Sequence, residues 1–216
     1  MKDSLLALGS TLIMILAGSA AHANPTLQKN LSDEDTAYTR VITERAGKIV
    51  ATLNLPDSAS FYRVRTIVAG QYRALNAIYT DRDNRLKEIK DQQPAPDKNT
   101  IDSIKKIVQQ DVDTRITKLH SEYLATLAKA LDSNRIDKVK DGMTYNVRQV
   151  TFNAYVQMIP QLTDEQKNVI MADLIEAREH AMDAESSEKK HAWFGKYKGR
   201  INNYLSSQGL NTKQTK

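Results

Sequence analysis

A stretch near the carboxyl-terminal end of the chain carries side chains that could do acid–base or metal chemistry. Glu176 and His180 are four residues apart, and Asp183 follows three residues after His180. Residues at these spacings share one face of a helix, so the three could form half of a metal site or an acid–base pair. The His-x-x-x-His zinc pattern is absent, and no second stretch carries histidine and carboxylates at comparable spacing. We therefore expect neither a bound metal nor another cofactor.

A second group of candidates follows directly in the sequence. His191, beside Lys190 and close to a predicted helix start, could hold a carboxylate or a sulfate. Trp193 could offer an aromatic surface to a sugar, or it could belong to the core. The last 28 residues contain seven basic and no acidic side chains, and such a local excess favours an anionic partner. The candidate ligand-binding residues are Arg178, Glu179, His180, Lys190, His191, Trp193, Lys196, Lys198 and Arg200.

The elements that must position these residues are predicted to be helices. The chain has 216 residues, of which 40% are hydrophobic and 26% charged, with only eight Gly and five Pro, unlike a disordered or collagen-like chain. The absence of Cys excludes disulfides and thiolate chemistry. Apolar residues recur three or four positions apart, the spacing of one helical face. We expect an all-α fold, an antiparallel multi-helix bundle, with segments that begin near Ser32, Asp57, Ile101, Thr163 and Ser186.

Two parts of this helical pattern stand out. The stretch 144–152 is rich in β-branched and aromatic residues, so we expect it to be irregular or extended, with a short helix before Pro160. Gly195 and Gly199 weaken an isolated helix, so we expect them to pack closely against another element. The expected organisation is a signal peptide over 1–23, a flexible mature N-terminus over 24–31, a single helical domain over 32–208 and a flexible basic tail over 209–216.

Residues 1–23 have the features of an export signal. Lys2 precedes an apolar stretch from Leu5 to Gly18, and Ala21-His22-Ala23 places small residues before a cleavage site after Ala23. The apolar stretch of 14 residues is too short to span a bilayer, and the mature chain has no apolar run long enough for a transmembrane helix. We expect a periplasmic or secreted protein. Nucleic acid is not an expected partner, because export separates the protein from cytoplasmic nucleic acid.

Three segments of the chain resemble a known protein family. They are Asp141–Tyr145, Glu176–Ala184 and Ser187–Leu205. On these segments the chain is similar to domain-of-unknown-function family 3826, a secreted family, and the resemblance runs roughly from Arg45 to Leu205. This family is seen in polysaccharide-degrading Gram-negative bacteria. The resemblance therefore implies a cell-envelope or secreted setting and a link to glycan use, but it supplies no activity and no catalytic residues.

Three functions are compatible with these observations. The leading hypothesis is a non-enzymatic protein that binds an anionic ligand, such as an acidic glycan, or another envelope protein through the basic stretch. The second is an enzyme acting on acidic glycans, with His180 or His191 as acid or base and Arg178 or Lys190 neutralising a substrate carboxylate. The third is a chaperone-like helical cradle, because Leu162–Gln166 is similar to the Leu-Thr-x-x-Gln box of small periplasmic helical chaperones. A cradle needs a large exposed apolar surface.

Overall fold

The structure is a computed structural model that describes residues 25–92, 94 and 96–210. The expected signal peptide, with its cleavage site, and residues 211–216 of the expected basic tail lie outside the described residues. The described residues form helices and no strand, which confirms the all-α fold. The helices are α1 (Pro25–Ala51), α2 (Ser58–Lys90), α3 (Lys98–Ala128), α4 (Ser133–Met143), α5 (Val147–Met158), α6 (Asp164–Met182) and α7 (Ser187–Ser207).

The chain divides into two units between Ala37 and Tyr38. The first unit contains the initial turns of α1, which begins at Pro25 rather than near Ser32. Residues 25–31, expected to be flexible, are therefore helical. The second unit contains the rest of α1 and helices α2 to α7, and everything described below lies within it.

Side-chain caps fix the starts of the helices that position the candidate residues. The capping box predicted at the start of α6 is present: Gln166 N–H donates to Thr163 Oγ1, and Thr163 N–H donates to Gln166 Oε1. At the start of α7, Lys189 N–H donates to Ser186 Oγ. Such caps satisfy N–H groups that have no partner inside the helix. Aspartate side chains cap the starts of α2, α3 and α4, at Asp57, Asp97 and Asp132.

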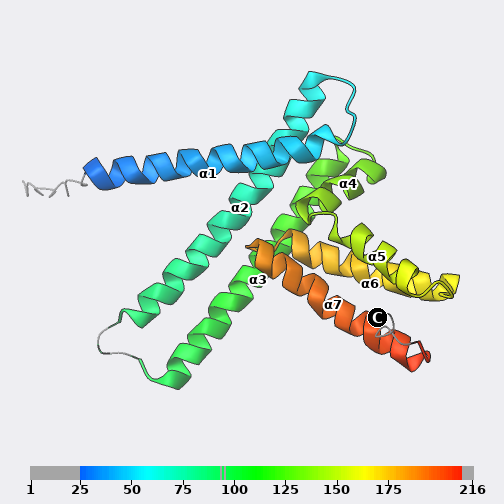
Figure 1. The fold of residues 1–216 in the computed structure, drawn as a ribbon. Coiled ribbons are helices and arrows are strands. Elements are labelled where there is room, and N and C mark those ends of the chain that lie inside the picture. Colours follow the sequence, from blue (N-terminus) through cyan, green and yellow to red (C-terminus); the bar gives the residue numbers. More distant parts are fainter. Residues whose placement is uncertain (1–24, 93, 95, 211–216) are drawn as a thin grey trace, which may run out of the picture. The chain divides into compact units, whose positions relative to one another are not determined.

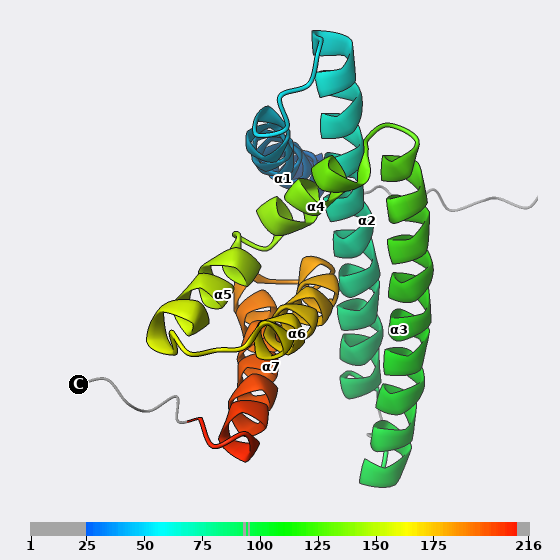
Figure 2. The same ribbon diagram turned by 90° about the vertical axis from the view of Figure 1, so that its right-hand side faces the viewer.

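Two hydrophobic cores hold the second unit together. Helices α1 to α4 form the first, whose fully buried side chains include Ile42, Val64 and Leu127. Helices α5 to α7 form the second, around Leu174 and Phe194. Each such side chain contributes about 1.5–3 kcal/mol by leaving water. Within the unit, α2 pairs with α3 and α6 pairs with α7, each as an antiparallel pair (Figures 1 and 2).

Helix α6 connects the two cores. Ala177 and Ala181 are buried in the second core, whereas Met182, the last residue of α6, is buried in the first. The turn between α6 and α7 therefore lies where the two cores meet. Among the described residues, no helix is long and apolar enough to cross a membrane.

The irregular stretch between α4 and α5 is shorter than the sequence predicts. Only residues 144–146 separate the two helices, and the extended alternative is wrong for 147–152, which form the first half of α5. Burial of Tyr155 in the second core, with Phe152 packed against it, outweighs the weak local preference of the β-branched residues. Tyr145 and Asn146 have φ angles of 57° and 61°, a left-handed conformation that is costly for a bulky side chain.

The glycines of α4 and α7 have different roles. A Cβ atom at Gly142 would lie 2.9 Å from Ile49 Cγ2, so α4 approaches α1 more closely there than alanine permits. A Cβ atom at Gly195 or Gly199 would meet nothing within 4 Å, and both residues are exposed. The close packing expected at Gly195 and Gly199 is therefore wrong, because α7 buries its other face, which carries Phe194.

This contrast predicts opposite effects of two alanine substitutions. Gly142→Ala should lower the free energy of unfolding by about 1–3 kcal/mol, because the added methyl group overpacks the contact with Ile49. Gly199→Ala should raise it by up to about 1 kcal/mol, because alanine favours the helix and meets no neighbour. Urea unfolding followed by circular dichroism measures both values, and equal effects of the two substitutions would contradict the close approach at Gly142.

Candidate functional site

A buried arginine organises the charged groups beside the α6–α7 turn. Arg178 is 2% exposed and donates hydrogen bonds to Asp141 (3.0 Å), Asp137 (2.8 Å) and Glu179 (3.1 Å). Arg148 binds the same Asp141 carboxylate through two nitrogens, at 2.9 and 2.5 Å. Burial acts to raise the pKa of Asp141, but the two guanidinium groups outweigh it and lower the pKa. Asp141 is therefore held as a carboxylate between two cations.

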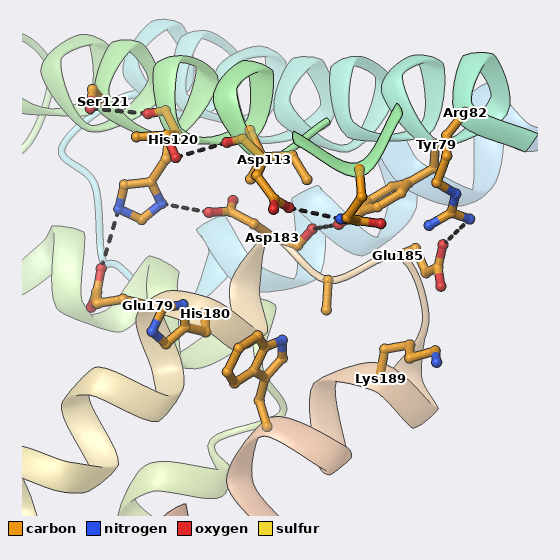
Figure 3. Close-up of a pocket in the computed structure, with 15 residues that line it drawn as sticks. Tyr79, Arg82, Asp113, His120, Ser121, Glu179, His180, Asp183, Glu185 and Lys189 are labelled. Atoms are coloured by element: carbon orange, nitrogen blue, oxygen red, sulfur yellow. Dashed lines mark hydrogen bonds and ion pairs between the residues drawn. The ribbon is translucent and has the colours of Figure 1, made fainter. Parts of the chain in front are cut away.

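The network continues from Glu179 to a histidine on α3. Glu179 Oε2 accepts a hydrogen bond from Lys140 Nζ at 2.9 Å and lies 3.6 Å from His120 Nε2. On its other side, the His120 ring is hydrogen-bonded through Nδ1 to Asp183 Oδ2 at 2.6 Å. Figure 3 shows His120 between these two carboxylates. The bond to Asp183 outweighs burial and raises the pKa of His120, with Glu179 acting in the same direction and Lys140 against it.

Asp183 is held from three sides. Its carboxylate receives a hydrogen bond from Gln71 Nε2 at 3.2 Å in addition to the bond with His120, and Tyr79 OH donates to its backbone oxygen at 2.8 Å. Burial raises the pKa of Tyr79 to about 12, helped by Glu185 and Asp183, so this hydroxyl stays a neutral donor. The α6–α7 turn is thus fixed to both α2 and α3.

Four residues of this network, Tyr79, His120, Glu179 and Asp183, line a cavity of about 640 Å³ (Figure 3). Its walls come from α2, α3, α6, α7 and the α6–α7 turn. The volume lies within the range typical of small-ligand sites. Carboxylate, imidazole, guanidinium, ammonium, amide and hydroxyl groups line it together with the apolar surfaces of Ile116 and Trp193.

Three of the nine candidate ligand-binding residues meet in this cavity, as does Asp183 of the predicted metal or acid–base group. Glu179, His180 and Trp193 all line it. The rings of His180 and Trp193 are stacked, with their centroids 4.4 Å apart, and Lys196 Nζ lies 4.9 Å from the Trp193 ring centroid. Trp193 is half-buried, so it belongs partly to the core and partly to the cavity wall, and its ring already has two partners.

The predicted basic residues of α7 are more dispersed. Arg200 pairs with Asp173 and with Glu176, the latter at 2.7 Å. Lys190 is buried, and Lys198 is exposed and does not line this cavity. The positive charge of α7 is therefore partly neutralised and partly buried, rather than forming one continuous surface.

The two histidines proposed as acid or base lie in different places. His180 lines the cavity, whereas His191 stacks on Tyr145, with ring centroids 5.8 Å apart. Arg178, proposed to neutralise a substrate carboxylate, is already bound by carboxylates of the protein. Helices α6 and α7 do line a common cavity, but His191 and Arg178 are not part of its wall.

The sequence triad Glu176, His180 and Asp183 does not act as one group. Glu176 pairs with Arg200, His180 stacks on Trp193, and Asp183 binds His120. Within the described part of the chain, no group of three or more His, Asp and Glu residues is arranged to hold a metal ion.

His120, Tyr79 and Gln71 are the parts of the site that sequence reasoning missed. His120 is half-buried, and Ile116, Tyr123 and Leu124 stand three or four positions from it, so it lies in an apolar stripe of α3. A histidine in such a stripe needs a polar partner, but the partner is 63 residues away in the sequence. The signal was present, and only the fold shows that the partner is Asp183.

The structure thus defines an all-α protein with a polar cavity at the turn between its last two helices. The chain belongs to the family described as "Protein of unknown function (DUF3826)", whose sequence pattern matches residues 39–216. No curated protein matches the chain. The three segments that carry the family resemblance contact one another: Arg178 binds Asp141, Tyr145 stacks on His191, and Lys190 binds the end of α6.

The bond between His120 and Asp183 predicts a pH-dependent contribution to stability. Because folding raises the pKa of His120, the contribution is fully present below the unfolded value of about 6.5 and is lost as the pH rises through the folded value. His120→Gln should therefore lower the free energy of unfolding by about 1–3 kcal/mol at pH 5.5. The loss at pH 9 should be smaller. Urea unfolding at both pH values tests this.

His191→Gln is the matched control, because His191 is exposed and has no carboxylate partner among the described residues. A loss of stability on His120→Gln that is equal at the two pH values would argue against a charged His120 in the folded protein.

Proposed function

We propose that this protein is a non-enzymatic binding protein of the cell envelope, and that the cavity between α2, α3, α6 and α7 takes an acidic saccharide. The supporting observation is the composition of the cavity wall, which combines polar and charged side chains with the apolar surfaces of Ile116 and Trp193. The signal-like residues 1–23 support export, and the family resemblance supports a link to glycan use.

The wall offers both donors and acceptors of hydrogen bonds. Gln109, Ser121 and His120 can donate or accept, and the carboxylates accept. Saccharides need this mixture because each hydroxyl both donates and accepts, while their C–H faces pack against apolar surfaces such as Ile116 and Trp193. His120 is held in place by the network, so part of the cost of ordering the site is met before the ligand arrives.

One cation of the wall is available to a ligand with an acidic group. The four carboxylates have partners within the protein: Asp113 binds Gln109, Glu179 and Asp183 belong to the network, and Glu185 pairs with Arg82 at 2.5 Å. Lys189 lines the same wall and has no ion-pair partner among the described residues. Its ammonium group is therefore available to an anionic substituent of the ligand.

The chaperone-like alternative gains no such support. The large hydrophobic side chains that are exposed among the described residues are divided between five helices and the α4–α5 turn. They are Val41, Tyr62, Ile107, Tyr145, Val150, Met158 and Ile175.

The binding proposal predicts that Lys189 and Trp193 determine affinity for uronate oligosaccharides. At low salt, isothermal titration calorimetry should detect binding of a galacturonate oligomer but weaker binding of the neutral galactose oligomer of equal length. Lys189→Ala should weaken galacturonate binding about tenfold, because one partly screened charge contact is lost. Trp193→Ala should weaken the binding of both oligomers, because both lose the same apolar surface.

Lys198→Ala is the matched control, since Lys198 is exposed on the same helix and does not line this cavity. An equal loss of affinity in Lys198→Ala would indicate binding by the net charge of α7. Absence of binding to any uronate oligomer at low salt would remove the proposal.

An acid–base enzyme is the second candidate, and the geometry of His120 is the observation that favours it. Asp183 orients the imidazole through Nδ1, and His120 lines the cavity with Glu179 close to its other nitrogen. A carboxylate-oriented histidine can accept and return a proton during cleavage of a glycan. In this version, His120 takes the role that the sequence suggested for His180 or His191.

The enzymatic candidate predicts product formation from a uronic acid polymer. His120→Gln should reduce kcat about 100-fold or more, the usual contribution of a general acid or base, while His191→Gln should leave kcat unchanged. Reducing-end release and absorbance of unsaturated products measure the rate across pH 5 to 9. A protein that binds the polymer but releases no product over days would leave only the binding function.

A further inference from the structure

A second cavity lies on the other side of the α6–α7 turn and is not used by the proposed function. Its volume is about 340 Å³, and residues of α1, α2, the α4–α5 turn and the start of α7 line it. It shares Tyr79, Ala184 and Glu185 with the first cavity. The α6–α7 turn therefore separates two cavities of different character.

Lys190 is the buried charged group of the second cavity. It is 5% exposed, and its Nζ donates to the backbone oxygens of Ala181 (3.0 Å) and Met182 (2.8 Å). These bonds satisfy carbonyl groups at the end of α6, which have no partner inside the helix. No carboxylate of the described residues forms an ion pair with Lys190, although a buried charge is normally paired.

A second cation without an ion-pair partner lines the same cavity. Arg45 forms no ion pair among the described residues, and its guanidinium lies 5.6 Å from the Tyr72 ring centroid. Ser186 and Ser187, at the start of α7, also line the cavity. The N-terminus of a 21-residue helix adds a positive potential. Three positive groups of different origin therefore face one small space.

The acidic residues nearby do not neutralise this space. Asp83 and Glu185 line the cavity, but both pair with Arg82, at 2.7 and 2.5 Å. Asp183 acts on Lys190 from a distance, while its carboxylate is bound to His120.

The aromatic wall of the cavity includes a residue in a costly conformation. Tyr145 has a φ of 57° and stacks on His191. Strained residues of this kind persist where the surrounding structure holds them and gather at binding sites. Tyr38 and Tyr72 complete the wall, and burial raises the pKa of both, so their hydroxyls stay neutral between pH 7 and 9.

We propose that this cavity is a second ligand site, which binds an oxyanion, the carboxylate of a uronic acid or a sulfate group, between Lys190 and Arg45. The bound anion replaces the missing counter-ion of Lys190. This site does not depend on the proposed saccharide site, because its two cations, Lys190 and Arg45, do not line the first cavity.

The proposal predicts uptake of a proton on binding. Burial lowers the pKa of Lys190 to about 8, with Arg45 acting in the same direction and Asp183 against it. A bound anion favours the ammonium form, so at pH 8 binding should take up roughly half a proton. Affinity should fall about tenfold from pH 7 to pH 9, because the protonated fraction of Lys190 falls by about that factor.

Isothermal titration calorimetry of the full chain with sodium glucuronate and with sodium sulfate tests the proposal and distinguishes the two anions. At pH 8, the measured enthalpy should change with the ionisation enthalpy of the buffer. Arg45→Gln should weaken binding about tenfold at low salt, as expected for one lost charge contact. Lys48→Gln is the matched control, because Lys48 is an exposed cation of the same helix and does not line the cavity.

Lys190→Met keeps most of the length of the side chain without its charge, and should remove both the binding and its pH dependence. If this variant does not fold, Arg45→Gln and the buffer dependence of the unchanged protein still decide the question. Failure of both anions to bind at about 10 mM, binding without proton uptake, or equal weakening by Lys48→Gln would overturn the proposal. Lys189→Ala should leave this binding unchanged, so the result is independent of the saccharide test.

Discussion

The arrangement of the second unit, from Tyr38 onward, depends on the ion pairs of the buried Arg178 guanidinium. A charge that is almost fully removed from water is stable only with carboxylates around it, and Arg178 has three, on α4 and α6. Loss of one partner would leave buried charge without compensation. The pair with Asp141 therefore fixes how α4 meets α6, and with it the first core against the second.

From this centre, polar contacts extend to the cavity wall. Glu179 contacts both Arg178 and His120, and Asp183, which follows the last residue of α6, binds His120. Each group is oriented by a neighbour that is itself oriented, which is the arrangement that a binding site needs. The same contacts that hold two hydrophobic cores together thus hold the wall of the cavity in place.

Residues of the α6–α7 turn line both cavities, and the two cavities differ in their charged groups. On one side, the first cavity has four carboxylates, all with partners, and Lys189, which forms no ion pair among the described residues. On the other side, the second cavity has Lys190 of α7, whose ammonium group binds carbonyl oxygens at the end of α6, and Arg45 of α1. One short turn thereby places two chemically distinct spaces close to each other, and an acidic ligand is compatible with each for a different reason.

The sequence by itself determined most of the helices and several of their ends, but not the first turns of α1 or the first half of α5. Apolar spacing and side-chain caps act between residues three or four positions apart, so the caps at Thr163 and Ser186 could be read directly. It also indicated the region around Glu179, His180 and Trp193. Only the tertiary structure decided that His120 binds Asp183, that Lys190 is buried and that Gly199 faces solvent. These outcomes depend on contacts between residues that are distant in the sequence, and on which side of each helix the cores cover. The spacing of neighbouring residues in the sequence determines neither.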